Sequence, residues 1–143
     1  MSAEEADETL AEAFWAVARQ LRQMSRESLA PWDVSPSQAR AIRVLDHHGP
    51  VRLRDLAERL HIAPRSATEV VDDLEQRGLV ARQADPNDRR ATLVELTAKG
   101  AEVSDGIRQA RVAEADAYFR ELDEADRADL VRILRSLRKP ETS

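Results

Sequence analysis

Residues 54–96 read RDLAERLHIAPRSATEVVDDLEQRGLVARQADPNDRRATLVEL. At the start of this stretch, apolar residues recur at helical spacing and predict a short helix. These residues are Leu53, Leu56, Ala57 and Leu60. A turn at 61–63 separates that helix from a second one, which begins at Pro64 and ends at Gly78, because proline favours the start of a helix and glycine its end. The stretch therefore predicts two helices joined by a tight turn.

A β-hairpin is predicted after the second helix, because the apolar period changes there from helical to alternating. Residues 79–82 and 92–96 are typical of short strands, with Val94 and Leu96 on the inner face. Residues 85–88 between them read DPND, which is turn chemistry. Two arginines follow at once, so we expect a hairpin with a charged tip.

Long helices are predicted at both ends of the chain. Apolar residues at steps of three and four predict a helix over about residues 6–29, and similar stripes predict a helix capped by Thr97 and a final one over about 124–138. These terminal stripes need a surface to bury against. A second copy of the chain is the simplest partner.

Composition narrows the class of protein. The 143 residues are 42% hydrophobic but only 3% aromatic, which favours a single domain with an aliphatic core. There is no cysteine, which excludes disulfides and thiolate chemistry. No run of 18 apolar residues occurs, and the acidic N-terminus lacks the basic region of a secretory signal. The expected location is the cytoplasm.

The net charge of −5 is not typical of a nucleic-acid-binding protein, but the charge is unevenly distributed. Residues 1–12 contain five acidic and no basic residues, which equals the whole excess. Residues 51–90 contain eight arginines and eight acidic residues. Because phosphate contact depends on a local basic face, the acidic total predicts weak non-specific binding and does not exclude DNA.

The combination resembles the MarR family of winged helix-turn-helix regulators over nearly the whole chain. The matching residues are Asp55-Leu56-Ala57-Glu58-Arg59-Leu60, Val70-Val71-Asp72, Leu74-Glu75, Arg77-Gly78-Leu79-Val80, Asp88-Arg89-Arg90, Leu96-Thr97 and Gly100. In this order and spacing they are highly specific. The resemblance implies a mainly α fold with a small β-hairpin wing, in one domain over 1–143. The DNA-binding region would be 35–97, flanked by dimerisation helices at 6–30 and 98–138.

Some positions depart from the family pattern. His61 stands where the family often has glycine in a left-handed conformation, which histidine tolerates better than most residues but at some cost. Ala63 stands where serine is frequent, so we expect the second helix to lack its usual side-chain cap. Arg52, Arg54 and Arg65 occupy places more often small or uncharged. Base preference should therefore differ from that of relatives.

The first turns of the second helix are the predicted site of base contact. The residues there are Pro64, Arg65, Ser66, Thr68 and Glu69. In this motif the N-terminal part of the second helix reaches base edges in the major groove. Arg65 suits guanine through paired donors, and Glu69 can accept from cytosine N4. An ordinary solvated helix face is the alternative interpretation.

The hairpin tip is the second predicted contact. Arg89 and Arg90 suit insertion into a minor groove, whose negative potential attracts guanidinium groups. We expect Asp88 to orient one of them through a bidentate pair. The alternative is a solvated turn.

Helix starts supply weaker phosphate candidates. Ser35, Pro36 and Gln38 make a strong helix start, with serine as N-cap and glutamine three residues later. Ser37 and Gln38 at this start, and Arg54 at another, are predicted phosphate contacts because backbone donors are also free there.

A ligand pocket is predicted between the first helix and the DNA-binding region, where the resemblance places small aromatic or phenolic acids. Its candidate lining residues are Phe14, Trp15, Trp32 and Arg43. Core and dimer packing explain the aromatic residues equally well.

The sequence offers no metal or catalytic site. His47 and His48 point about 100° apart on a helix, and the last two helices contain no His or Cys to complete a site. Phosphate loops, nucleophile elbows and triad spacings are missing. We therefore expect neither a cofactor nor an enzyme activity.

The resemblance implies a homodimeric, sequence-specific DNA-binding regulator. We expect a repressor of transcription on a palindromic operator in double-stranded DNA, with affinity modulated by a small aromatic ligand. The alternative is a winged-helix dimer that serves as a protein–protein interaction module without specific DNA binding. The two differ in whether Arg65 and the arginines of the hairpin tip share one basic face in the dimer.

Overall fold

The structure is a computed structural model that describes residues 7–140. Its elements in chain order are α2 (Leu10–Glu27), η1 (Ala30–Trp32), α3 (Pro36–His48), β1 (Val51–Arg52), α4 (Leu53–Leu60), α5 (Pro64–Gln76), β2 (Val80–Asp85), β3 (Asp88–Leu96), α6 (Ala98–Phe119) and α7 (Glu124–Leu137). The predicted mainly α fold with a hairpin wing is confirmed. The first residue of the predicted helix over 6–29, and the acidic Glu4 and Glu5, lie outside the described residues.

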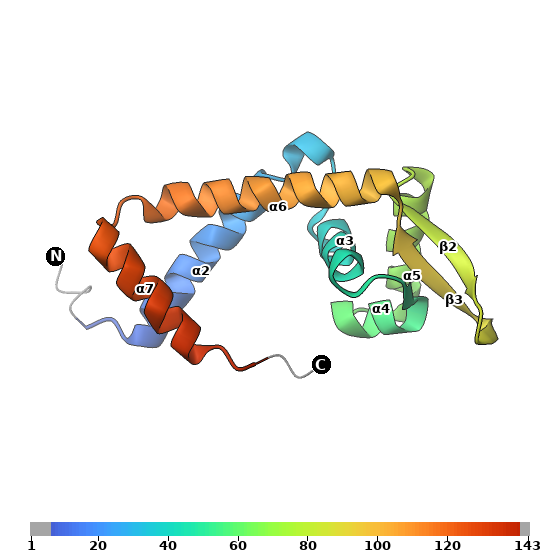
Figure 1. The fold of residues 1–143 in the computed structure, drawn as a ribbon, viewed down its shortest axis with the longest axis horizontal. Coiled ribbons are helices and arrows are strands. Elements are labelled where there is room, and N and C mark those ends of the chain that lie inside the picture. The colour runs from blue at the N-terminus through green and yellow to red at the C-terminus, as the bar shows by residue number, and fades with distance from the viewer. Residues whose placement is uncertain (1–6, 141–143) are drawn as a thin grey trace.

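Helix α6 joins the two ends of the molecule and packs along each of them (Figure 1). At one end α3, α4, α5 and the sheet pack together, and we call residues 34–97 the head. At the other end α2 and α7 accompany the second half of α6, and we call these three segments the arm. The start of α5 and the tip of the hairpin point to the same lower side of the head in Figure 1.

Local sequence explains where the helices of the head begin and end. The Ser35 hydroxyl accepts a hydrogen bond from the Gln38 backbone N–H (3.1 Å), and the Gln38 side chain accepts one from the Ser35 N–H (2.9 Å). This reciprocal cap starts α3 as predicted. At the end of α5, Gly78 has a φ of 74°, a left-handed conformation that glycine adopts without strain. The chain turns there into β2.

The sheet has three antiparallel strands in the order β1-β3-β2. The sequence predicted only the two hairpin strands and missed β1, in which Val51 pairs with Val94 and Arg52 with Leu93. Two residues are too few to display an alternating pattern. The hairpin strands, Val80–Asp85 and Asp88–Leu96, are also longer than the predicted 79–82 and 92–96.

The hydrophobic core lies in the head. Helices α3, α4 and α5 each bury three residues, and the sheet closes the core from one side through Val80 and Val94. The predicted stripe of α5 faces this core: Ala67, Val71 and Leu74 are fully buried. The core fixes how α5 lies against the sheet and so sets the position of its opposite face.

Candidate nucleic-acid interface

The turn between α4 and α5 presents the start of α5 at the surface. His61 takes the predicted left-handed conformation (φ 55°), and its backbone N–H donates to the Glu58 carbonyl (3.1 Å). Ala63 is the N-cap of α5 and makes no side-chain cap hydrogen bond, as its small side chain predicts. Pro64 follows at the first helical position. The remaining backbone N–H groups of this first turn are therefore left for solvent or an anion.

The exposed face of α5 carries the predicted base-contact residues. The Arg65 side chain is 93% exposed and the Glu69 side chain 72%, and their closest charged atoms are 4.0 Å apart. Such an open pair holds neither side chain firmly, so both can reorient toward a ligand. Ser66 is exposed. Thr68 is half-buried, and its hydroxyl donates to the Pro64 carbonyl (3.0 Å).

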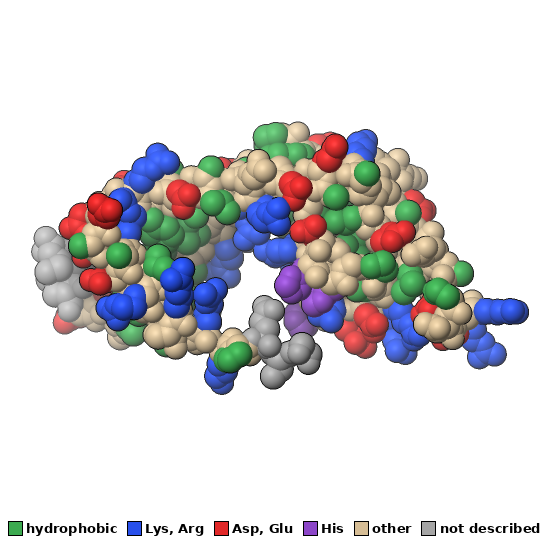
Figure 2. Space-filling model, in the orientation of Figure 1, with side chains coloured by type: hydrophobic (Ala, Val, Ile, Leu, Met, Phe, Trp, Pro, Cys, Tyr) green, Lys and Arg blue, Asp and Glu red, His purple; other side chains and the backbone are tan. Residues whose placement is uncertain are grey.

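The hairpin tip presents Arg89 and Arg90 to solvent. Figure 2 shows Lys and Arg side chains projecting from this free end of the hairpin. Asp88 does not form the predicted bidentate pair. Its carboxylate instead accepts the Arg90 backbone N–H (3.0 Å), and within residues 7–140 neither tip arginine forms an ion pair. Because the carboxylate is used to shape the backbone, the guanidinium groups stay uncommitted.

The three candidates at helix starts differ in their surroundings. Ser37 and Arg54 are exposed. Gln38 is engaged inside the protein, because its side chain caps α3 and also donates to the Asp73 carboxylate. This second bond ties α3 to α5 and gives Gln38 a structural role that the sequence did not reveal.

Acidic residues on α5 are neutralised within the protein. The Arg82 guanidinium of β2 donates to Asp72 (2.5 Å) and Glu75 (2.9 Å). Burial opposes the charge of Arg82, but the two carboxylates outweigh it and raise its pKa. This cluster also braces the hairpin against α5. The sequence did not single out Arg82, although its place on a strand beside an acidic helix face is the signal that marks it.

A groove of about 630 Å³ lies between α2, α3 and α6. Of the predicted ligand-lining residues only Arg43 lines it. Phe14 and Trp15 stack edge-to-face at 5.6 Å on α2 and are about half exposed. Trp32 packs against α6, where a side chain at Gly106 would lie 2.7 Å from its ring. The groove thus lies between the predicted elements and includes Arg43, while Phe14, Trp15 and Trp32 lie outside its lining. Their role in ligand binding stays a prediction.

Arginines and apolar residues line the groove instead. Arg40, Arg43, Arg108 and Arg111 line it together with apolar residues such as Ile42 and Ile107, and two acidic residues, Asp46 and Glu114, lie there as well. Burial, then repulsion from Arg111 and Arg40, lowers the pKa of Arg43. This crowding of guanidinium groups disfavours the charged form of Arg43. An anionic ligand would offset the repulsion and is therefore favoured. Residues 40 and 43 are three apart, as are residues 108 and 111, so each pair lies on one helix face. This spacing is the signal by which the sequence could have revealed the arginines of the groove.

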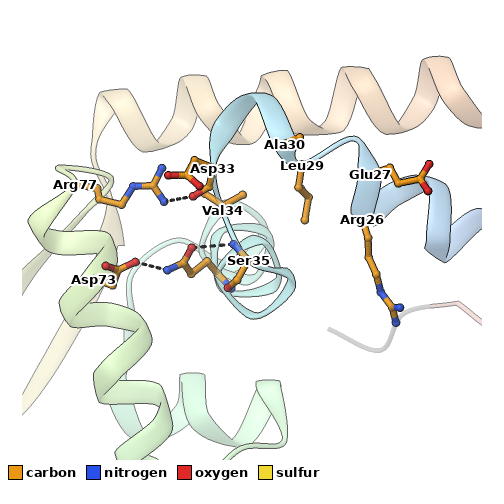
Figure 3. Close-up of a pocket in the computed structure, with 10 residues that line it drawn as sticks. Arg26, Glu27, Leu29, Ala30, Asp33, Val34, Ser35, Asp73 and Arg77 are labelled. Carbon is orange, nitrogen blue, oxygen red and sulfur yellow. Dashed lines mark hydrogen bonds between the residues drawn. The ribbon is translucent and has the colours of Figure 1, made fainter.

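A second groove, of about 660 Å³, is bounded by the end of α2, η1, the start of α3 and α5. Figure 3 shows Arg77 reaching from α5 to the connector around Asp33. Its guanidinium donates to the carbonyls of Trp32 (2.7 Å) and Asp33 (2.8 Å). These bonds fix the connector between arm and head to the last turn of α5.

Residues 7–140 hold no group of three His, Asp or Glu side chains placed to bind a metal ion. His48 Nε2 lies 3.0 Å from an Arg59 guanidinium nitrogen. None of the described helices is long and apolar enough to span a bilayer.

Comparison with known proteins agrees with this geometry. Residues 34–92 match the sequence model of the MarR family. The transcriptional regulator MhqR of Bacillus subtilis is 33% identical over 93 residues, 65% of this chain and 64% of MhqR. The transcriptional repressor MdtR of the same organism is 35% identical over 74 residues, 52% of this chain and 48% of MdtR. The chain thus spans less than two thirds of either relative.

The fold is shared more widely than the sequence. The ligand-free structure of MarR from E. coli superposes with a TM-score of 0.84 at 22% identity, over 92% of this chain and 98% of that one. The matching segment, 34–92, holds the helix-turn-helix and most of the wing. The predicted resemblance to the MarR family is confirmed over residues 34–92, and the chain has the winged helix-turn-helix fold.

Proposed function

We propose that this protein is a transcriptional repressor that binds an inverted-repeat operator in double-stranded DNA as a homodimer. One observation carries the proposal: the exposed start of α5 and the tip of the hairpin point to the same side of the head (Figure 1). That arrangement suits a helix in the major groove and a wing in the adjacent groove. The compartment in which it would act is the cytoplasm.

In the major groove, Arg65 is the principal proposed base contact. Its side chain is almost fully exposed, and its fork of donors matches guanine O6 and N7. Glu69, one turn further along the same face, would accept from cytosine N4. Pro64, Ser66 and Thr68 complete this first-turn surface.

In the neighbouring groove, Arg89 and Arg90 are the proposed contacts. Both side chains are exposed, and a narrow minor groove concentrates negative potential that attracts them. Asp88 contributes by shaping the backbone at Arg90. Ser37 and Arg54 remain proposed phosphate contacts. Gln38 is not included in the proposed DNA-binding surface, because its side chain forms hydrogen bonds within the head.

The second copy would pack on the arm. Large apolar side chains are exposed there in this single chain: Leu10, Phe14, Trp15, Val112, Val131, Ile133, Leu134 and Leu137. Figure 2 shows hydrophobic side chains gathered on the visible face of the arm. Contiguous exposed apolar surface of this kind marks an interaction site, and a two-fold dimer would present two α5 helices to one operator.

The arginine-lined groove is the proposed site of regulation. Apolar walls with converging guanidinium groups suit a small aromatic acid. Because the groove lies between α2 and the head, a ligand there would alter the separation of the two α5 helices. That separation must match about one turn of DNA, roughly 34 Å, so a small shift would weaken the complex.

Selection of bound duplexes from random DNA tests the proposal. The expected outcome is an enriched inverted repeat whose half-sites lie about one helical turn apart. Arg65→Ala should then relax the preference at one symmetric base pair in each half-site. Recovery of sequences without an inverted repeat would favour the alternative of a protein-interaction module.

A further inference from the structure

A buried carboxylate lies at the base of the hairpin tip. The Asp85 side chain is only 7% exposed, and each of its oxygens has a partner. One accepts from Nε of Arg52 (2.9 Å), and the other accepts from the backbone N–H of Asn87 (2.9 Å). The Asn87 N–H, together with Arg52, holds the pKa of Asp85 below its ordinary value although burial opposes this. Asp85 is therefore a satisfied, charged group inside the protein.

The strand register changes at this residue. Ala84 pairs with Thr92, but the next pair is Asp85 with Asp88. Strand β3 therefore holds three residues, 89–91, between two pairs that are adjacent on β2. The two tip arginines lie in this bulge, and bulges redirect the side chains that they contain. The orientation of the arginines thus depends on how the turn is held at Asp85.

Arg52 connects that turn to the body of the head. It ends β1, is the N-cap residue of α4 and pairs in register with Leu93 of β3. Its side chain is 37% exposed, but its guanidinium nitrogen points at Asp85 rather than into solvent. The ion pair therefore joins the hairpin tip to the start of the helix-turn-helix, across 33 residues of sequence.

We infer that Arg52 and Asp85 are positioning residues for the DNA contact of the hairpin, although neither needs to contact DNA. The ion pair holds the bulge that carries Arg89 and Arg90 at a fixed angle to the head. A tip that is ordered before binding loses less conformational entropy when it enters a groove. This inference rests on the proposed groove contact of the tip arginines, and it assigns Arg52 a role other than phosphate contact.

The experiment compares five variants on one selected operator: Arg52→Met, Arg52→Lys, Asp85→Asn, Arg90→Ala and the double variant Arg52→Met/Arg90→Ala. Asp105→Asn is the matched control, because it removes a carboxylate paired with Arg108 (2.7 Å) on α6, away from the hairpin. Circular dichroism establishes that each variant is folded. Binding affinity and a hydroxyl-radical footprint then report the contact of the tip.

Arg52→Met and Asp85→Asn should each weaken binding roughly tenfold and lose the footprint in the groove that the tip enters, while the α5 footprint remains. Arg52→Lys should retain much of the affinity, because it keeps the charge. The double variant should bind about as well as Arg52→Met alone, since Arg90 no longer reaches the groove once the anchor is absent. Asp105→Asn should bind like the wild type.

Two results would overturn the inference. One is wild-type affinity and footprint for folded Arg52→Met. The other is additive losses in the double variant, because independent effects mean that the ion pair does not act through the tip. Should Asp85→Asn fail to fold, the comparison of Arg52→Met with Arg52→Lys decides alone. A failure of the proposed function is distinguishable, because Arg90→Ala by itself would then leave affinity unchanged.

Discussion

Two helices of this molecule are equally amphipathic and yet differently buried. In the head, α5 turns its apolar stripe inward and buries three residues. In the arm, α2 has as strong a stripe and buries none, and α7 likewise buries none. Amphipathicity predicts that a helix has an apolar face but not what covers it. The head contains its own core, whereas the arm lacks a partner within this chain.

This difference separates two tasks. The head holds the proposed DNA contacts on a scaffold whose packing is complete. The arm would hold two heads at a fixed distance, and its stability would depend on the second copy. Any change in the arm, whether by mutation or by a ligand in the adjacent groove, would thus alter DNA binding without touching a DNA contact.

The largest expected effect comes from placing a charge on the apolar face of the arm. Leu134→Asp should abolish the dimer and operator binding together, because a buried unpaired charge costs about 3–5 kcal/mol. Sedimentation velocity and an operator-binding assay measure the two. Ser136→Asp is the matched control, since this exposed residue lies on the other side of α7. A Leu134→Asp chain that still dimerises would remove α7 from the interface.

The next effect concerns α5. Arg65→Ala should cost about 1–3 kcal/mol on the best operator and relax one symmetric base pair per half-site, while the dimer stays intact. Arg65→Lys is the control, because it keeps the charge but loses the paired donors that suit guanine. Equal binding by the alanine and wild-type chains would mean that α5 is placed differently.

The hairpin tip should give a smaller and less selective effect. Arg89→Ala or Arg90→Ala should weaken binding to all sequences, with a salt dependence lowered by about one unit of slope for each phosphate contact that is removed. Titrations at several salt concentrations measure this slope. An unchanged slope would show that the tip stays in solvent.

The arginines of the groove should affect the binding of the ligand and not the binding of DNA. Arg43→Met or Arg111→Met should lower the affinity for a hydroxybenzoate, measured by calorimetry, and leave ligand-free operator binding unchanged. Arg19→Met, which changes an exposed arginine of α2 that does not line the groove, is the matched control. Operator release by this compound with undiminished potency in both arginine variants would place its site elsewhere.

Peroxide should not release the operator, because the chain has no cysteine.

The smallest effect is a pH dependence at the hairpin. The Asn87 N–H and Arg52 lower the folded-state pKa of Asp85, so its contribution to stability is present above the unfolded-state pKa and is lost as the pH falls through the folded one. The melting temperature of the wild-type chain should therefore fall below about pH 4 more steeply than that of Asp85→Asn. Parallel curves for the two chains would contradict this contribution.

The head was largely predictable from sequence because its signals are local. The cap at Ser35, the left-handed position at His61, the helix end at Gly78 and the stripe of α5 each depend on residues within a turn or two. Strand β1 was missed because two residues carry no period. The link from Arg52 to Asp85 was missed because it joins residues that only the folded chain brings together.

The lining of the groove also depends on contacts between residues that are distant in the sequence. Aromatic residues were expected to line it because the resemblance places small aromatic ligands there, but Trp32 packs the connector against Gly106. Arg43 does line the groove, and its contact with a ligand stays a prediction. Its partner Arg111 comes from α6, and no local pattern states which face of α6 meets α3. Tertiary packing decides which helix faces pair, and the sequence of either helix alone does not show the pairing.

Amide hydrogen exchange at decreasing protein concentration tests the difference between head and arm most directly. Exchange is followed by mass spectrometry on peptides from α2 and α7 and from α4 and α5. We predict that, on dilution, amides of the arm lose their protection from exchange first, while those of the head core around Leu56 and Val71 keep theirs. The reason is that only the arm depends on a second copy. Protection of the arm that is independent of concentration, in a chain that sediments as a monomer, would contradict the account.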